Sequence, residues 1–198
     1  ANDDFDHGAF EFEVLDSATE LHERIIALNR PANRARVVAG YCWDWKSKRN
    51  PEAWDIEIPE QGYRRQWNLG SDGSLWIIAP ESVEQVGCIH TCQGLEVDYV
   101  GVIIGPDLVA RDGRLVARPE ARSKMDRSIR GWKKAVKHDA SSIGRVEQII
   151  RNTYRTLMTR GMKGCLVTST DEETRNFLRK RLVQLELSPK VSPRDPES

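Results

Sequence analysis

The sequence predicts a three-layer α/β domain built on a mostly parallel sheet. Strand-like and helix-like patterns alternate along the chain, as is typical of such sheets. The run from Tyr99 to Ile104 is apolar on both faces, which indicates a central strand covered by helices. Apolar residues from Val146 to Met158 recur at helical spacing, and this repeat predicts a helix over about 142–159.

Local signals predict the remaining elements. The Asp112-Gly113 pair lies between two alternating arms, so a hairpin is expected over 108–117. Ser17 with Glu20, and Thr170 with Glu173, have the spacing of capping boxes that open two further helices. Gly161 is expected in a left-handed cap after the 142–159 helix. Further short strands are expected at 10–14, 36–40, 75–78, 86–89 and 164–168.

These elements form one domain over 10–187, with insertions at about 41–73 and 108–140. Residues 1–9 are expected to be a disordered or vector-derived N-terminus, and the proline-containing stretch 188–198 a flexible tail. The first insertion is rich in tryptophan. Its rings form either a base-stacking platform or a satellite core under a long loop, and the core is favoured. The tryptophans are Trp43, Trp45, Trp54 and Trp67.

The charge of the chain is balanced overall but not locally. Lys plus Arg and Asp plus Glu number 30 each. From Arg111 to Asp139, however, ten basic residues face four acidic ones, which indicates either a phosphate-tracking surface or a solvated insertion. No apolar run approaches the roughly 20 residues of a membrane span, and four scattered cysteines indicate reduced thiols. A cytoplasmic protein without a membrane partner is expected.

The segment 88–105 reads as a strand, a loop with a glycine, and a second strand. Such a loop is expected to present its polar groups at the carboxyl ends of the sheet. Cys88, His90 and Cys92 alternate along it. An extended strand does not fold around a tetrahedral ion, and no fourth ligand is evident. No metal site is therefore predicted.

Arg160 follows directly on the helix predicted over 142–159. A guanidinium there can stabilise charge on a transferring phosphoryl group. It can equally be a cation that interacts with the helix dipole. The residue alone does not decide between these two interpretations.

Two segments together resemble known helicase motifs. Ile89–Val100, Ile-His-Thr-Cys-Gln-Gly-Leu-Glu-Val-Asp-Tyr-Val, resembles motif V of superfamily 1 helicases, and Tyr154–Lys163 resembles motif VI. The residues of these two segments, which include Asn152–Arg155 and Thr159–Gly164, are similar to the C-terminal part of the DUF2075 family. That family comprises predicted ATP-dependent DNA/RNA helicase-like proteins related to the Schlafen P-loop ATPases. The resemblance spans roughly 12–185.

The resemblance implies a RecA-like fold and specific residue roles. In such proteins ATP lies between two RecA-like domains, and the second domain carries motifs V and VI. Gly94 and Glu96 match positions that approach the sugar and phosphates, and Arg160 matches the catalytic arginine that touches the γ-phosphate. Arg155 occupies a motif VI position that is often apolar, so its role is undecided. The positions that link nucleic acid contact to the nucleotide are His90, Thr91 and Gln93.

The phosphate-binding half of such a site is absent from this sequence. A complete ATPase needs a Gly-x-x-x-x-Gly-Lys-Ser/Thr loop, and the chain contains no Gly-Lys pair. ATP and Mg²⁺ are therefore expected only together with an N-terminal ATPase domain of the same protein, and the chain alone is expected to hydrolyse no ATP. DNA or RNA is the expected further partner. The alternative is a non-catalytic nucleic-acid or protein binding module with the same fold.

Overall fold

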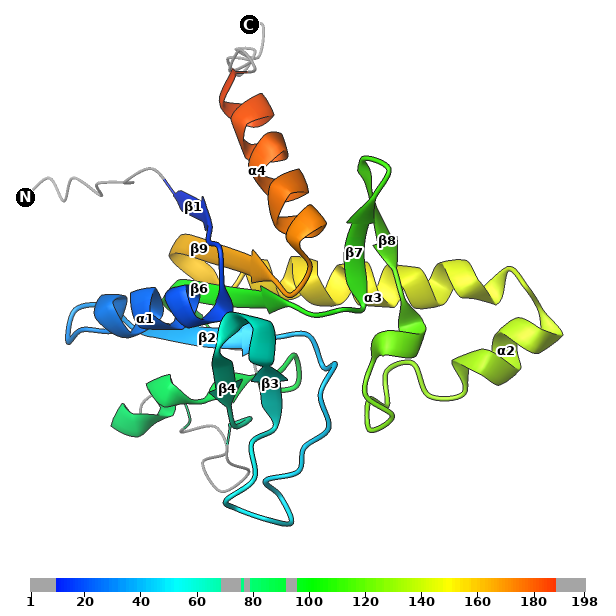
Figure 1. The fold of residues 1–198 in the computed structure, drawn as a ribbon, viewed down its shortest axis with the longest axis horizontal. Coiled ribbons are helices and arrows are strands. Elements are labelled where there is room, and N and C mark those ends of the chain that lie inside the picture. Colours follow the sequence, from blue (N-terminus) through cyan, green and yellow to red (C-terminus); the bar gives the residue numbers. More distant parts are fainter. Residues whose placement is uncertain (1–9, 69–75, 77–78, 92–95, 188–198) are drawn as a thin grey trace, which may run out of the picture.

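The computed structural model describes residues 10–68, 76, 79–91 and 96–187. At its centre lies a five-stranded, all-parallel sheet with the strand order β1-β9-β6-β2-β5 (Figure 1). Helices cover both faces, so the predicted three-layer RecA-like α/β class is confirmed. The strands of this sheet are β1 Glu11–Val14, β2 Ala35–Ala39, β5 Val86–Gly87, β6 Val97–Ile104 and β9 Gly161–Ser169.

Two helices sandwich the sheet. Helix α1, Ala18–Leu28, packs on one face, and helix α3, Ser142–Met158, packs on the other. A Cβ atom added at Gly101 of β6 would lie 2.7 Å from side-chain atoms of α1, so this glycine lets the helix approach the strand closely. No described helix has the length and apolar character needed to cross a membrane.

The two predicted capping boxes have different outcomes. The Glu20 amide donates to Ser17 Oγ at 3.1 Å, which confirms the cap of α1. The box of Thr170 and Glu173 is wrong, because α4, Glu172–Leu187, begins after Asp171. Asp171 Oδ2 accepts the Thr174 amide at 2.9 Å. Thr170 instead donates its amide to the Ile104 carbonyl at the end of the sheet.

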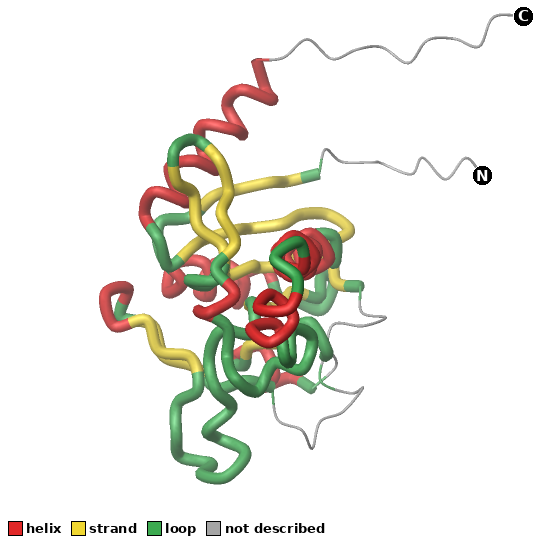
Figure 2. Tube along the Cα trace, turned by 90° about the vertical axis from the view of Figure 1, so that its right-hand side faces the viewer, coloured by secondary structure: helices red, strands yellow, loops and turns green. Residues whose placement is uncertain are grey.

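The described residues form two hairpins outside the central sheet. The predicted one is confirmed as β7 Leu108–Arg111 and β8 Arg114–Ala117, with φ of 52° at Asp112 and 72° at Gly113. It stands beside α4 in both views (Figures 1 and 2). The other, β3 Ile56–Ile58 and β4 Tyr63–Arg65, was not predicted. Of the strand expected at 75–78, only Trp76 is described, and it lies in a turn.

Shorter helical segments complete the described chain. Helix α2 precedes α3, and single 3₁₀ turns follow β3, precede β5 and follow β8. These are α2 Trp132–His138, η1 Pro59–Gln61, η3 Pro80–Glu84 and η4 Pro119–Ala121.

The tryptophans of 41–73 serve as core residues, as favoured from the sequence, but they do not form a separate satellite core. Trp67 belongs to the same buried cluster as residues of α1 and β2, and Trp43 and Trp45 pack against that cluster. Trp67 is fully buried, and its ring meets Tyr41 edge-on with 5.5 Å between centroids. Trp43 and Trp45 pack at 6.4 and 6.3 Å from the Trp67 ring. Trp54 is the most exposed of the four, at 39%. Aromatic stacking inside the protein therefore occupies most of these rings.

Gly161 is required for its size and not for a left-handed backbone. It is the first residue of β9, and the positive-φ glycines of the described chain do not include it. A Cβ atom at this position would lie 2.1 Å from the Gly164 carbonyl oxygen. The cap predicted here is wrong, because the chain passes directly from α3 into β9.

His22 of α1 is hydrogen-bonded to β4 and to the 3₁₀ turn η3, and it is expected to make stability depend on pH. Its Nδ1 lies 2.7 Å from the Tyr63 hydroxyl and its Nε2 lies 2.8 Å from the Val83 carbonyl oxygen. That carbonyl can only accept, so Nε2 carries the proton of a neutral ring. Burial lowers the pKa of His22 from 6.5 to about 4, against the Val83 hydrogen bond and with a smaller contribution from Arg65.

The unfolded chain therefore takes up the proton that charges the His22 ring more readily than the folded chain does. As a result, the free energy of unfolding falls as the pH drops from about 6.5 to about 4. The difference amounts to about 3 kcal/mol in the free energy of unfolding. Urea unfolding at pH 7 and pH 4.5 measures it, and His22→Gln is expected to remove that part of the pH dependence. Equal slopes in the two proteins would contradict the assignment.

Candidate functional site at the amino edge of the sheet

The segment that resembles motif V and the segment that resembles motif VI are joined at one edge of the sheet. The Val97 amide donates to the Arg160 carbonyl at 3.0 Å. Glu96 directly precedes β6 and Arg160 directly precedes β9, and these two strands are parallel neighbours. Glu96 and Arg160 therefore lie together at the amino edge.

The expectation that the 88–105 loop presents its groups at carboxyl ends is wrong for Glu96. The segment starts after β5 and ends where β6 begins. Because β5 and β6 both run parallel to β2, a connection between them must cross from the carboxyl edge to the amino edge. Within the segment that resembles motif V, the residues just after β5 therefore lie at the carboxyl edge, and Glu96 lies at the amino edge.

Arg160 has a guanidinium that is only partly used by the protein. Its Nε donates to the Thr156 carbonyl at 3.1 Å, and its amide donates to Leu157 at 3.2 Å. Within the described residues its two terminal nitrogens have no partner, and the side chain is half-buried. Arg155, in the last turn of α3, is exposed. The side chain with spare donors at this edge is therefore that of Arg160.

A charged pair beside these residues has no assigned role in the sequence analysis. Lys163 Nζ lies 2.9 Å from Asp98 Oδ1, and the Arg34 amide donates to Asp98 Oδ2 at 2.7 Å. Partial burial opposes ionisation of Asp98, but the Arg34 amide and Lys163 outweigh it, so the pKa of Asp98 is lowered. Both residues stand inside the motif segments. Their pairing depends on strand register, which the sequence does not reveal.

His90 and Thr91 lie toward the other edge of the sheet. Thr91 Oγ1 accepts the Cys88 amide at 2.8 Å and lies 2.8 Å from the Cys88 carbonyl. The His90 ring meets Tyr41, just beyond β2, edge-on at 6.5 Å. Gln93 and Gly94 lie outside the described residues. Of the predicted site residues, the structure thus brings Glu96 and Arg160 together and places His90 and Thr91 apart from them.

The carboxyl edge holds a buried charge cluster that sequence reasoning missed. Arg122 Nε donates to Asp107 Oδ2 at 2.7 Å, its Nη1 donates to Asp126, and the Tyr154 hydroxyl donates to Asp107. The Gly105 amide donates to that hydroxyl at 2.9 Å. Burial raises the pKa of Tyr154 well above 10, and the Asp107 charge adds to this shift. These side chains tie β6, α3 and the second insertion together.

Two cavities also open at the carboxyl edge, and Trp43 and Glu57 line both. The one of about 340 Å³ is lined by Pro106, Arg118 and Thr170 among others. The one of about 480 Å³ includes Arg122 and Lys124. The described residues therefore offer concave surface at this edge, whereas Arg160 lies at the amino edge.

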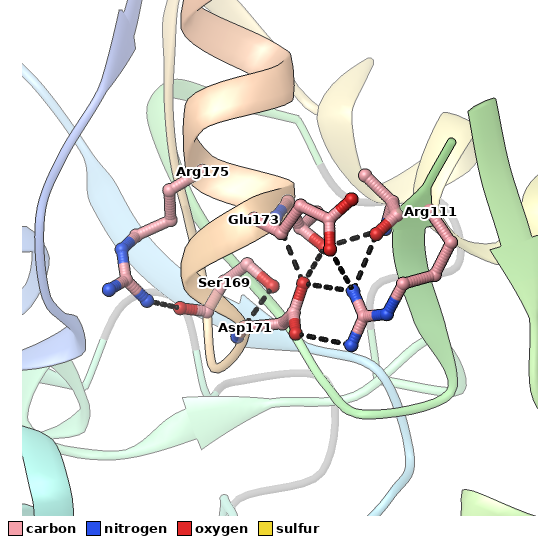
Figure 3. A network of polar contacts seen from close by, with 7 residues as sticks. Arg111, Ser169, Asp171, Glu173 and Arg175 are labelled. Atoms are coloured by element: carbon pink, nitrogen blue, oxygen red, sulfur yellow. Dashed lines mark hydrogen bonds and ion pairs between the residues drawn. The ribbon is translucent and has the colours of Figure 1, made fainter. Parts of the chain in front are cut away.

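A polar network at the start of α4 accounts for its acidic residues (Figure 3). Arg111 donates to both carboxylate oxygens of Asp171, at 2.9 and 2.8 Å, and lies 3.3 Å from Glu173. The hydrogen bonds from Arg111 lower the pKa of Asp171 to about 2. Arg175 bonds the Ser169 carbonyl at 2.7 Å. These acids hold β7 against α4.

The amino edge fits part of ATP but not Mg²⁺. The spare Arg160 nitrogens suit phosphate oxygens, and the exposed Glu96 carboxylate has no ion-pair partner in the described chain. Asp98, the other carboxylate here, is already bonded by Arg34 and Lys163. Nowhere in the described residues do three His, Cys, Asp or Glu side chains gather as metal ligands. Arg160 and Glu96 thus offer donors and acceptors of the kind that phosphate and sugar groups bind, and a metal ion would need other ligands.

Comparisons with known proteins support a helicase-related domain. A model of the Schlafen group 3 DNA/RNA helicase domain matches residues 1–171. An uncharacterized protein of Saccharomyces cerevisiae is 26% identical over 173 residues, which are 85% of this chain and 36% of that relative. The chain thus spans about a third of the relative's length. No solved structure matches. Because the family model covers most of its length, this chain belongs to the Schlafen group 3 DNA/RNA helicase domain family.

Proposed function

We propose that this chain is the second RecA-like domain of a superfamily 1 helicase-like ATPase. Motifs V and VI would supply one wall of an ATP site, and a P-loop domain of the same protein would supply the other. The observation that carries the proposal is the 3.0 Å hydrogen bond from the Val97 amide to the Arg160 carbonyl, which joins the two motifs. The more specific proposal, that the chain is related to the DUF2075 family, rests on the amino-acid sequence of these motifs.

In the proposed mechanism, this chain and the P-loop domain contribute different groups to the reaction. Bound Mg²⁺·ATP supplies the phosphoryl group that water attacks. Arg160, held through Nε by the Thr156 carbonyl, directs its free nitrogens at the developing negative charge, and Glu96 and Gly94 hold the sugar and phosphates. Charge stabilisation by a positioned guanidinium requires little rearrangement during the reaction. The P-loop wall provides the lysine and the metal ligands.

Coupling to nucleic acid follows from the course of motif V. His90 and Thr91 lie at the carboxyl edge and Glu96 lies at the amino edge, so the proposed nucleic acid contacts of His90, Thr91 and Gln93 and the proposed nucleotide contact of Glu96 belong to one short stretch of sequence. Strand binding near His90 would shift this segment, and closure of the two walls would bring Arg160 to the phosphate. DNA and RNA both present the backbone that such a contact needs.

The test compares this chain with the two-domain protein, in which it is joined to a P-loop domain encoded in the same gene. The two-domain protein is expected to hydrolyse ATP faster with single strands present, and this chain alone is expected to hydrolyse none. A phosphate-release assay measures both. Hydrolysis by the isolated chain, or a gene without a P-loop, would contradict the proposal.

A non-catalytic binding module is the second candidate, and the exposed cations of residues 124–138 favour it. In that case the RecA-like fold would serve only to hold nucleic acid or protein. The two candidates differ in nucleotide dependence. Strand affinity of the two-domain protein should change with ATP analogues if it is an ATPase, and stay constant if it is a binding module.

A further inference from the structure

The most basic part of the second insertion lies on the surface beside the start of α3. This basic arm comprises residues 124–138, which end in α2, and lies at the end of the molecule away from α1 (Figure 1). All of its cations are exposed, and no ion pair to the described residues neutralises them. They are Lys124, Arg127, Arg130, Lys133, Lys134 and Lys137.

The acidic residues next to these cations are engaged elsewhere. Asp126, the one carboxylate within the arm, is 4% exposed and is bonded by Arg122. Asp139, directly after the arm, accepts from the Ser141 amide at 2.9 Å and hydroxyl at 2.7 Å. No acidic residue stands between Arg127 and His138. The arm therefore presents a strong positive field to solvent.

The arm has a fixed base, and its exposed large apolar side chain is that of Met125, which lies before α2. Ile129 is 6% exposed, and the Ser128 amide donates to Asp126 at 2.8 Å, so the buried charge cluster holds the segment before α2. Trp132 and Val136, one turn apart, are the half-buried residues of α2, which packs on α3. Helices that bind lipid surfaces insert an apolar face, and the described α2 does not present one.

We propose that the basic arm is a phosphate-binding surface for single-stranded nucleic acid, separate from the motif V and motif VI residues. It rests on the nucleic-acid part of the proposed function. Six unpaired cations on a fixed support suit a polyanion whose charge is regularly spaced, and binding of this kind releases counterions. Helix α3 has 17 residues, so its first turn lies about 25 Å from Arg160. At that distance salt screens the arm's charge from the nucleotide edge.

The test is fluorescence anisotropy of this chain with a labelled single strand of about 20 nucleotides, at several salt concentrations. The variant carries Arg130→Gln, Lys134→Gln and Lys137→Gln. Each lost phosphate contact lowers the slope of log Kd against log salt by about 0.7, so the slope should fall by about 2 and Kd should rise about 10- to 100-fold near 0.1 M salt. These side chains are exposed, and the fold should be unaffected.

The matched control removes the same three charges elsewhere, with Arg30→Gln, Arg49→Gln and Lys180→Gln, which are also exposed. Its affinity should stay within about twofold of the parent chain. Binding with equal salt slopes in parent and arm variant would overturn the arm proposal alone. Failure of the parent chain to bind strands would overturn it together with the nucleic-acid part of the proposed function. Arm-dependent binding to phosphatidylserine vesicles in preference to strands would also overturn it.

Discussion

Replacing Arg160 with alanine is expected to reduce the strand-stimulated ATPase of the two-domain protein by about 10³- to 10⁵-fold in kcat, the range for a phosphate-contacting arginine. The backbone contact that joins the motifs should survive, because the Val97 amide bonds the Arg160 carbonyl and not its side chain. The side chain itself makes one hydrogen bond, to the Thr156 carbonyl. Its loss should cost about 1 kcal/mol of stability or less.

The matched control is Arg155→Ala, which removes a side chain of the same type five residues earlier, in the last turn of α3. Arg155 is exposed, and turnover should stay within a few-fold of the parent. Phosphate release at saturating ATP measures kcat, and equilibrium binding of an ATP analogue shows whether ground-state affinity changes as well. Unchanged turnover in Arg160→Ala would overturn the assignment, whereas a similar loss in both variants would indicate that the general positive charge of this region matters.

Elements with strong local signals were the predictable part of the fold. Strand β6 is apolar on both faces because both faces are covered, by α1 and α3. The β7–β8 hairpin follows from Asp112-Gly113, which adopts the positive φ values that its turn requires. Helix α3 follows from its repeat. In each case neighbouring residues carry the signal, and distant contacts only reinforce it.

Elements that depend on distant contacts were missed. The β3–β4 hairpin has three-residue strands, too short to show a period. Gly161 was assigned to a cap from its place after a helix, but the close approach of the Gly164 carbonyl explains it. For the basic stretch from Arg111 to Asp139, one of the two expectations was a solvated insertion, yet Ser123 and Ile129 within it are buried. Nothing in the local pattern distinguishes these residues from their exposed neighbours.

The candidate site likewise has residues that the sequence predicted and residues that it did not. Arg160 and Glu96 were named from the resemblance of two motifs, and the sheet places them at one edge. The sequence predicted the carboxyl edge, but the two residues lie at the amino edge, because they precede β6 and β9 instead of following them. Asp98 and Lys163 pair across neighbouring strands, and that register is a property of the sheet and not of either segment.

Replacing Arg122 with alanine is expected to destabilise the protein by about 3–5 kcal/mol, because it leaves two carboxylates buried without their partner. The side chains of Arg122 and Asp107 are 0% exposed, and that of Asp126 is 1% exposed. Burial by itself lowers the pKa of Arg122, but the Asp107 and Asp126 carboxylates more than compensate and raise it above its usual value. The charges of this cluster thus depend on one another.

Arg118→Ala is the matched control, since Arg118 lies four residues earlier, is exposed, and bonds Asp107 only through its backbone amide. Its stability should stay within about 0.5 kcal/mol of the parent. Urea unfolding at pH 7 compares the two variants, and similar small losses in both would show that water reaches the cluster. Because Asp126 holds the base of the basic arm while Tyr154 lies on α3, Arg122→Ala should also loosen the arm. Amide hydrogen exchange, compared between the variant and the parent, would report this local release if it accelerates more over 124–138 than over β6.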